Sequence, residues 1–481
     1  MNGADLGLIG LAAMGQNLAL NFARNGFRVC VYNRTADQTR AFLEQVREEA
    51  LCAAYSLDDL ARCLVRPRRI LLMVRAGTAV DEVLEQLLPF LEKGDVVMDG
   101  GNSHFADTER RMQALAAEGI RFLGLGISGG TKGALLGPSL MPGGSPEAYA
   151  AVEEMLTRIA AVSDAGPCCA YMGRGGAGHF VKMVHNAIEY AFMQGIAEAY
   201  DGMRTGMGMS PEVAAEVFAR WNEGALQAYL TELTARVLRY RDPETGEPLV
   251  ERILDEAEQK GTGRWAAQSA LELGVPAPTL TAAVTARTLS HFKAHRERLA
   301  ALLPWPGPVP AAPEGFLADL EDGLNLTLLV AFSQGLWLLH EASRQYQYGT
   351  DRAEVLRIWR AGCIIRARWL PFLEEILRED PENPHLLFHP RFLEQIRQRL
   401  PGAIRARRWA LEAGVPMPAL GSALEYLQAM RRAWLPANLI QAQRDAFGAH
   451  TYRRIDRPGV FHTEWEETIS PRPQGRSPWS V

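Results

Sequence analysis

The chain has 481 residues, 47% of them hydrophobic and 22% charged, so at about 150 residues per domain there is room for roughly two to four domains. Its 51 basic and 56 acidic residues leave a net charge of −5, which argues against nucleic acid or an anionic membrane as a partner. No apolar run reaches the ~18 residues that a bilayer requires, and the N-terminus lacks the basic region of a signal peptide. Six cysteines show no metal-ligand spacing, and Cys168 and Cys169 are adjacent, so we expect a reducing compartment and a cytoplasmic protein.

The first stretch predicts a dinucleotide-binding unit. An apolar strand at 6–9 runs into Gly10-Leu11-Ala12-Ala13-Met14-Gly15, a G-x-A-x-x-G variant of the dinucleotide fingerprint. A helix follows over about 16–25 and stops at Gly26, where a glycine C-cap is expected, and a second strand covers 27–32. The fingerprint requires this order of strand, glycine turn, helix and strand, which seats a pyrophosphate at the helix N-terminus.

The residues after the second strand bear on which coenzyme is bound. An NAD enzyme usually has Asp or Glu here to hold the ribose 2′-hydroxyl, whereas this chain has Asn33-Arg34-Thr35. A carboxylate would repel a 2′-phosphate, and the Arg34 guanidinium can grip one. We therefore predict NADP; the alternative is a surface arginine in a turn.

Further parallel strands are expected at 70–74, 96–99 and 122–127, each ending in small or polar residues. The carboxyl ends of such strands are where doubly wound sheets bind ligands. We expect a loop at 137–144, then a helix with Ser145 as N-cap and Pro146 at its first position. A last strand at 168–172 would close a first domain of residues 1–177.

From Gly178 onward, long helical patterns replace the strand signal and carry an internal repeat. The ten residues 271–280, LELGVPAPTL, recur at 411–420 as LEAGVPMPAL, an offset of 140. Gln194-Gly195 recurs at 334–335 with the same offset, and Trp221-x-x-Gly224 recurs at 359–362. We interpret residues 178–434 as an all-helical domain built from a tandem repeat.

A polar stripe follows the glycine-rich run 173–178. Lys182, His185, Asn186, Glu189 and Tyr190 fall within one arc of roughly 140° on a helix that is otherwise apolar. Such a helix belongs in a core, where ionisable groups need partners or a ligand. The alternative is an amphipathic helix that shows water a narrow polar face.

The second copy of the repeat serves as a control for this stripe. At offset 140 the first four stripe positions correspond to Asp322, Asn325, Leu326 and Leu329, so packing does not require the stripe residues. The same comparison sets Lys260, Thr262 and Arg287 against Leu400, Gly402 and Leu427. Lys260-Gly261-Thr262-Gly263 offers a cation, a hydroxyl and backbone amides together, as a phosphate site would.

With these motifs in view, the chain resembles the 6-phosphogluconate dehydrogenases, within the wider β-hydroxyacid dehydrogenase group. The resemblance covers about residues 5–466, and its matching stretches are 10–18, 33–35, 100–103, 128–130, 137–144, 178–190, 260–265, 286–290 and 436–452. It implies an α/β Rossmann-type N-terminal domain, a large all-α domain and a C-terminal tail, residues 435–481, that reaches the partner subunit of a homodimer with shared active sites.

The implied activity is the oxidative decarboxylation of 6-phosphogluconate to ribulose 5-phosphate and CO2 with formation of NADPH, a step of the pentose phosphate pathway that uses no metal. By the same resemblance, Lys182 is the general base and Glu189 the acid that protonates C1. The residues implied for the sugar acid are Asn102, Ser128, Gly129, Gly130, His185 and Asn186. Those implied for its phosphate are Tyr190, Lys260, Thr262, Arg287 and, from the tail of the other subunit, Arg444, with His450 nearby. Those expected to bind the coenzyme are Gly10, Ala12, Ala13, Met14, Gly15, Asn33, Arg34, Thr35, Met73, Val74, Arg75 and Asn102.

One loop departs from the family pattern and keeps two other interpretations open. Thr131 and Lys132 stand where the family usually carries two glutamates, in a loop beside the nicotinamide. A non-catalytic NADP-binding relative is one alternative, although the intact stripe favours an enzyme. A dehydrogenase for an unphosphorylated sugar acid is the other, although the full set of phosphate residues argues against it. The last eleven residues are rich in proline and are expected to be disordered.

Overall fold

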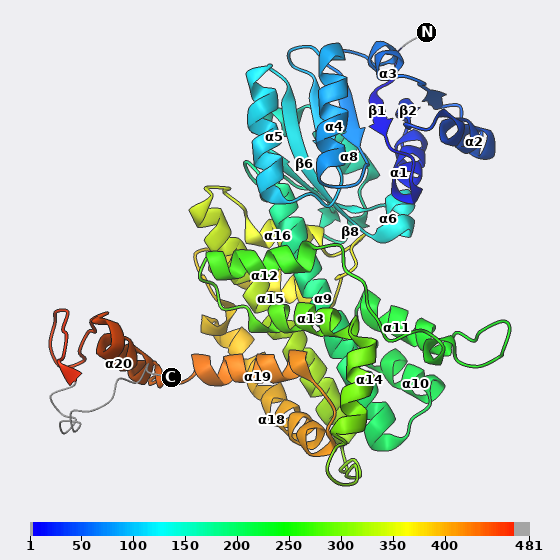
Figure 1. Ribbon diagram of the computed structural model, residues 1–481. Coiled ribbons are helices and arrows are strands. Elements are labelled where there is room, and N and C mark those ends of the chain that lie inside the picture. The colour runs from blue at the N-terminus through cyan, green and yellow to red at the C-terminus, as the bar shows by residue number, and fades with distance from the viewer. Residues whose placement is uncertain (1–2, 466–481) are drawn as a thin grey trace, which may run out of the picture. The chain divides into compact units, whose positions relative to one another are not determined.

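The computed structural model describes residues 3–465 (Figure 1). The chain forms two compact units, Met1–Leu424 and Glu425–Val481, and each is described by itself. The domain boundaries expected after residues 177 and 434 remain a prediction. The last eleven residues, expected to be disordered, lie outside the described part.

The first unit begins with a seven-stranded sheet in the order β3-β2-β1-β4-β5-β6-β7. Neighbouring strands are parallel from β3 to β6, and β7 pairs antiparallel with β6. The strands are β1 (Leu6–Ile9), β2 (Val29–Tyr32), β3 (Leu51–Ala53), β4 (Arg69–Leu72), β5 (Val96–Asp99), β6 (Arg121–Ser128) and β7 (Ser139–Gly144), and a separate hairpin pairs β8 (Val162–Ser163) with β9 (Gly166–Pro167). The helices and 3-10 turns between them are α1 (Ala13–Arg24), α2 (Ala36–Val46), α3 (Leu57–Cys63), α4 (Thr78–Leu87), η1 (Leu88–Phe90), α5 (Phe105–Ala117), α6 (Gly130–Leu136), α7 (Pro146–Ala150) and α8 (Glu153–Ile159).

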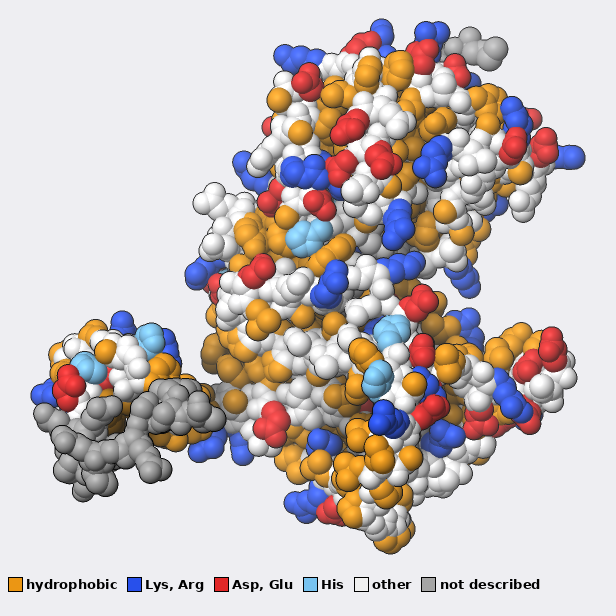
Figure 2. Space-filling model, in the orientation of Figure 1, with side chains coloured by type: hydrophobic (Ala, Val, Ile, Leu, Met, Phe, Trp, Pro, Cys, Tyr) orange, Lys and Arg blue, Asp and Glu red, His pale blue; other side chains and the backbone are white. Residues whose placement is uncertain are grey.

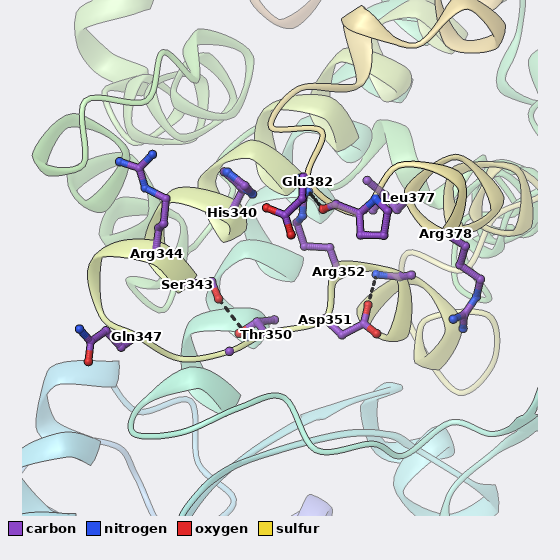
Figure 3. A pocket seen from close by; sticks show the side chains of 13 residues that line it. His340, Ser343, Arg344, Gln347, Thr350, Asp351, Arg352, Leu377, Arg378 and Glu382 are labelled. Atoms are coloured by element: carbon purple, nitrogen blue, oxygen red, sulfur yellow. Dashed lines mark hydrogen bonds between the residues drawn. The ribbon is translucent and has the colours of Figure 1, made fainter.

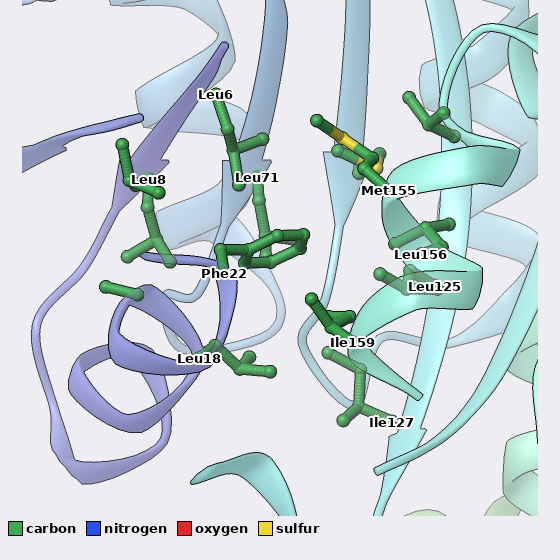
Figure 4. Packing of buried hydrophobic residues seen from close by; sticks show 14 of the residues in the cluster. Leu6, Leu8, Leu18, Phe22, Leu71, Leu125, Ile127, Met155, Leu156 and Ile159 are labelled. Carbon is green, nitrogen blue, oxygen red and sulfur yellow. The ribbon is translucent and has the colours of Figure 1, made fainter. Parts of the chain in front are cut away.

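Strand side chains alternate between two apolar clusters, one on each face of the sheet. Leu71 and Met98 face a cluster built around Phe22 of α1 (Figure 4), whereas their neighbours Leu72 and Val97 face the cluster under α3, α4 and α5. A strand buried on both faces has a continuous apolar run, and the expected parallel strands have this pattern.

The predictions for this sheet were largely correct, with the differences at its edges. The strands expected at 6–9, 70–74, 96–99 and 122–127 are present, and Ser145 caps α7 as expected. The expected loop 137–144 is wrong, because residues 139–144 form β7, an edge strand where Pro142 and two glycines are tolerated. The expected strand 168–172 is also wrong, since only Cys169 forms an isolated bridge, with Leu140. Strand β3 was not predicted.

The second half of this unit is helical and shows the repeat directly. Helices α11 (Tyr229–Arg239) and α17 (Trp369–Glu379) begin and end 140 residues apart, as do α13 (Pro278–Ser290) and α19 (Pro418–Met430). The remaining helices and 3-10 turns up to the start of α19 are α9 (Ala177–Met207), α10 (Pro211–Trp221), η2 (Leu249–Glu251), α12 (Thr262–Glu272), α14 (Lys293–Leu302), α15 (Phe316–Gln345), α16 (Arg352–Ile358), η3 (Leu386–Phe388) and α18 (Pro390–Ala413).

The two longest helices, α9 and α15, pack antiparallel through the glycines of the repeated Gln-Gly pair. A Cβ at Gly195 would lie 2.9 Å from Leu324, and one at Gly335 would lie 3.2 Å from Val184. Val184 and Leu324 are themselves 140 residues apart, so the glycine of each copy packs against the equivalent apolar side chain of the other copy. Helix α15 is long and apolar enough to cross a membrane by composition, yet 89% of that window is buried, as in the core helix of a globular domain.

Glycines also let α9 approach the sheet closely. A Cβ at Gly126 of β6 would lie 2.6 Å from the Lys182 Cβ, and one at Gly124 would lie 2.8 Å from the His179 ring. A Cβ at Gly143 of β7 would likewise clash with the backbone of Gly178. The helix therefore crosses the carboxyl end of β6, which places Lys182 beside it.

In the second unit, α20 (Ala437–Gly448) is followed by a short bridge between Tyr452 and Phe461. The buried Asp445 carboxylate accepts hydrogen bonds from the Thr451 amide, the His462 ring and the Trp465 indole at 2.8 to 2.9 Å. This carboxylate ties the end of the described tail back to α20. Figure 2 shows acidic and basic side chains interspersed over the visible face, in keeping with the balanced charge.

Candidate active site

The glycine turn after β1 forms one wall of a cavity of about 380 Å³. Gly10 has a φ of +103°, and a Cβ there would lie 2.5 Å from the Met73 carbonyl oxygen, so glycine is required. Helix α1 begins at Ala13, its first turn is uncharged, and Ala12 at the N-cap has no side-chain oxygen to occupy the free amides. These features fit a coenzyme pyrophosphate at the helix N-terminus.

The far end of this cavity is built from the residues that follow β2. The Asn33 Oδ1 accepts a hydrogen bond from the Leu11 amide at 3.1 Å, which ties the glycine turn to this segment. Arg34 and Thr35 are exposed and line the cavity. Eight of the twelve residues predicted for the coenzyme line it: Gly10, Ala12, Asn33, Arg34, Thr35, Met73, Val74 and Arg75.

The polar stripe of α9 lies at the carboxyl end of β6 and is buried and internally hydrogen-bonded. The Lys182 Nζ donates to the Asn186 Oδ1 at 2.8 Å, and the Asn186 Nδ2 donates to the Thr262 Oγ1 at 3.0 Å. Lys182, His185 and Asn186 are at most 8% exposed. The stripe is therefore not the solvated face of an amphipathic helix.

His185 links the stripe to β6 and, through Cys363, to the second repeat. Its Nδ1 lies 3.1 Å from the Asn186 Oδ1, which can only accept, so Nδ1 carries the proton. Its Nε2 then accepts, with the Ser128 Oγ at 3.0 Å and the Cys363 Sγ at 2.9 Å. Burial, followed by the charge of Lys182, holds the pKa of His185 well below its ordinary value, in keeping with a neutral ring.

The pKa values of Lys182 and Glu189, the amine and the carboxyl group of the stripe, are shifted in opposite directions. Burial lowers the pKa of Lys182 from its ordinary 10.5, which favours the neutral amine. Burial raises the pKa of Glu189 from 4.5, which favours the neutral acid, although Lys182 and Arg287 oppose that shift. A proton acceptor and a proton donor thus stand two helical turns apart on one face.

The residues expected to hold a phosphate gather at the other end of the stripe. The Arg287 guanidinium stacks over the Tyr190 ring at 3.5 Å, and a Cβ at Gly263 would lie 2.7 Å from that ring. Thr262 begins α12, whose first turn contains no acidic residue, and Lys260 lies exposed just before it. A helix N-terminus flanked by two cations suits a phosphate dianion.

The other predicted residues lie on turns at the sheet edge or in the second unit. Asn102 follows β5 in a turn held by Asp99, which accepts from the Gly101 amide and the Ser103 hydroxyl. Gly129, the N-cap of α6, and Gly130, its first residue, both have positive φ. Thr131 and Lys132 lie in α6, so this segment is a short helix rather than the expected loop. Ala13, Met14 and Gly15 form the first turn of α1. Arg444 and His450 belong to the second unit.

A second cavity, of about 700 Å³, lies elsewhere, between the C-terminus of α15 and α16–α17 (Figure 3). Two of its charged groups already have partners: Arg352 donates to the carbonyls of Pro381 and Asn383, and Asp351 caps α16. Its lining includes none of the predicted site residues. The α9 stripe remains the candidate site.

Comparison with known proteins decides the family. Residues 5–173 match the NAD binding domain of 6-phosphogluconate dehydrogenase, and residues 178–465 match the C-terminal domain of 6-phosphogluconate dehydrogenase. The chain belongs to the 6-phosphogluconate dehydrogenase family. A decarboxylating 6-phosphogluconate dehydrogenase from Synechococcus elongatus is 50% identical over 96% of this chain and 99% of its own length. An NADP(+)-dependent, decarboxylating one from Bacillus subtilis is 47% identical over 97% of this chain and its full length.

The chain is also similar to a solved structure of 6-phosphogluconate dehydrogenase from Plasmodium falciparum. That protein is described in its apo form, in complex with NADP+ and in complex with 6-phosphogluconate. It is 40% identical, covers 96% of this chain and 100% of its own, and superposes with a TM-score of 0.92. The Rossmann-type and helical fold predicted from the sequence is thereby confirmed.

Sequence reasoning missed the contribution of the second repeat to the site. Besides the Cys363 thiol, the Ile364 amide donates to the Ser128 Oγ at 3.3 Å, and a Cβ at Gly129 would lie 2.6 Å from the Gly362 carbonyl oxygen. Burial raises the pKa of Cys363 to about 12, so it is present as the thiol. The repeated Trp359-x-x-Gly362 motif was the available signal, since it ends immediately before Cys363.

Proposed function

We propose that this chain oxidatively decarboxylates 6-phosphogluconate to ribulose 5-phosphate and CO2 while reducing NADP to NADPH. The names of the relatives at 47 to 50% identity support this activity, as does the Plasmodium structure described with both NADP+ and 6-phosphogluconate. The observation in this chain that carries it is the buried pair Lys182 and Glu189, whose pKa values are shifted toward a neutral amine and a neutral acid.

Each group on the stripe has a role in this reaction. Bound NADP supplies the hydride acceptor. The neutral Lys182 amine takes the proton of the C3 hydroxyl as that carbon is oxidised, which leaves a β-keto acid. Lys182, now an ammonium, stabilises the enediolate oxygen that develops as CO2 departs. Glu189 then donates its proton to the carbon that carried the carboxylate, which becomes C1 of ribulose 5-phosphate.

The neighbouring side chains orient the substrate for these proton transfers. Asn186 holds the Lys182 Nζ, and His185 with Ser128 presents polar atoms toward the sugar hydroxyls. Tyr190, Lys260, Thr262 and Arg287 would bind the phosphate at the opposite end. A phosphate held there would fix the orientation of the sugar acid relative to the stripe.

An assay that follows nicotinamide reduction and CO2 release tests the activity. With 6-phosphogluconate and NADP we expect both products in equal amounts, and with gluconate a much lower kcat/KM. Equal rates with the two acids would identify an enzyme for an unphosphorylated sugar acid. Coenzyme binding without turnover on either acid would identify a non-catalytic relative.

We further propose a cytoplasmic homodimer in which Arg444 and His450 complete the active site of the partner subunit. The support is that both lie in the separate unit after Leu424, on and just after α20, rather than on the repeat. Lys182→Ala and Arg444→Ala dimers should each be nearly inactive. After subunit exchange, half the dimers carry one intact site, so activity should return to about a quarter of wild type. Exchange without recovery would mean that the tail serves its own chain.

A further inference from the structure

Three cysteines that are far apart in the sequence come together in the first unit, away from the α9 stripe. Cys30 lies on β2, Cys52 on β3 and Cys63 at the end of α3. Their three Sγ atoms lie within 4.8 Å of one another, and those of Cys52 and Cys63 are 3.4 Å apart. We call this group the thiol cluster.

Regular structure on three sides holds the thiol cluster in place. Cys30 and Cys52 are paired neighbours in the parallel β2–β3 ladder, so their side chains leave the same face of the sheet. Helix α3 covers that face and brings Cys63 over them, and the Cys63 carbonyl accepts from the Ala4 amide at 2.8 Å. Cys30 is fully buried, whereas Cys52 and Cys63 are only partly buried, so the cluster lies near the edge of the apolar core.

The ligand set is all sulfur and has three members. Among residues 3–465, these three thiols form the only group of three or more His, Cys, Asp or Glu side chains whose ligand atoms lie close enough to share one ion. Zinc in structural sites takes four ligands, whereas soft univalent copper is well matched to thiolates alone. Three sulfurs around one ion, with metal–sulfur bonds of about 2.3 Å, stand about 4 Å apart, close to the spacing already present.

We propose that the thiol cluster is a binding site for Cu(I), held in trigonal coordination by Cys30, Cys52 and Cys63. Binding replaces three S–H bonds with three Cu–S bonds and releases the three protons to solvent, with no change in oxidation state. The cluster shares its apolar surroundings with Tyr32 and Leu57, which also line the coenzyme cavity.

An anaerobic titration with the coloured Cu(I)–bicinchoninate complex tests the site on the full chain. We expect one Cu(I) per chain to transfer, seen as bleaching of the complex and as one added ion in the native mass. Cys52→Ser and Cys63→Ser, at the partly exposed positions, should each weaken Cu(I) binding by more than about 100-fold. This loss is larger than the roughly 10- to 100-fold expected when only a residue that hydrogen-bonds to a metal ligand is removed. Cys168→Ala, which removes a buried cysteine outside the cluster, should bind as wild type does.

Two outcomes would overturn the proposal. One is a wild-type chain that takes no copper from the complex. The other is a pair of serine variants that retain native circular dichroism and bind Cu(I) as tightly as wild type. Neither outcome touches the proposed dehydrogenase activity, because the cluster contains no residue of the α9 stripe.

Discussion

Helices α9 and α15 are equivalent elements of a repeat, and they carry different side chains at equivalent positions. Lys182, Asn186 and Glu189 of α9 correspond at offset 140 to Asp322, Leu326 and Leu329 of α15. Leu326 and Leu329 are fully buried, so a helix in this place packs well with leucine. Asn186 and Glu189 therefore stand where the second copy packs with leucine, so packing does not require them, which supports the proposal that they serve the chemistry.

The fourth equivalent pair shows how a polar side chain is used when it serves only the fold. Asn325, the counterpart of His185, donates to the Glu321 carbonyl and accepts from the Trp369 indole, both at 3.2 Å. Its hydrogen bonds are complete within its own copy. His185 instead connects β6, its own helix and the second repeat, as a group in a shared site would.

The largest expected effect is on Lys182. Lys182→Ala should reduce kcat by at least ~10²-fold, the low end for general acid–base catalysis, with NADP binding retained. Asp322→Ala, the same change at the equivalent position of the second copy, should leave kcat within a few-fold of wild type. Steady-state assays that measure kcat of both variants make the comparison. Equal losses of kcat would contradict the proposal that α9, and not α15, carries the catalytic side chains.

Substitution of Asn186 by the residue of the second copy should have the next largest effect. Asn186→Leu removes the acceptor of the Lys182 Nζ and the donor to Thr262. Hydrogen bonds to charged groups contribute about 1.5–3 kcal/mol, so kcat/KM should fall by roughly 10- to 100-fold. The measurement is kcat/KM for 6-phosphogluconate, and an unchanged value would show that Asn186 does not position the lysine.

Coenzyme choice should respond to Arg34 alone among these changes. Arg34→Ala should raise the KM for NADP by about 10-fold or more, since a charge-assisted hydrogen bond to the 2′-phosphate is lost, and leave the KM for NAD nearly unchanged. Measuring both constants separates recognition of the phosphate from a general effect. A parallel rise in both would mean that Arg34 does not contact the 2′-phosphate.

The pH dependence of kcat/KM should report the opposed shifts of the stripe. Loss of the Lys182 proton, at a pKa below the ordinary 10.5, should raise activity with pH, and loss of the Glu189 proton, at a pKa above 4.5, should lower it. Glu189→Gln should remove the falling limb of a pH–rate profile. If that limb persists unchanged in the variant, the acid is another group.

The parts of the fold and of the site that the sequence predicted depend on residues close together in the chain. The fingerprint after β1, Asn33-Arg34-Thr35 and the α9 stripe are short patterns tied to one turn or one helical face. Strand β3, only three residues long, and β7, rich in proline and glycine, were missed because pairing with neighbouring strands, rather than propensity, forms them.

Contacts that depend on distant segments could not be read in the same way. Cys363 meets His185 across 178 positions, and Gly126 admits Lys182 only because α9 crosses β6 there. The six cysteines showed no metal spacing, yet the β2–β3 register and α3 bring three of them together. Such contacts depend on how distant segments are arranged in the fold, and this arrangement cannot be read from a single sequence.

The central claim, that the α9 stripe serves catalysis and not packing, is tested most directly by exchanging Glu189 with its counterpart Leu329. Glu189→Leu should cut kcat by about 10²-fold or more, yet lower the free energy of unfolding in urea by no more than about 0.5 kcal/mol, because burial already disfavours the carboxylate. Leu329→Glu, which buries an unpaired charge, should instead destabilise the protein by about 3–5 kcal/mol. Wild-type turnover in Glu189→Leu, or a loss of stability as large as that of Leu329→Glu, would contradict the claim.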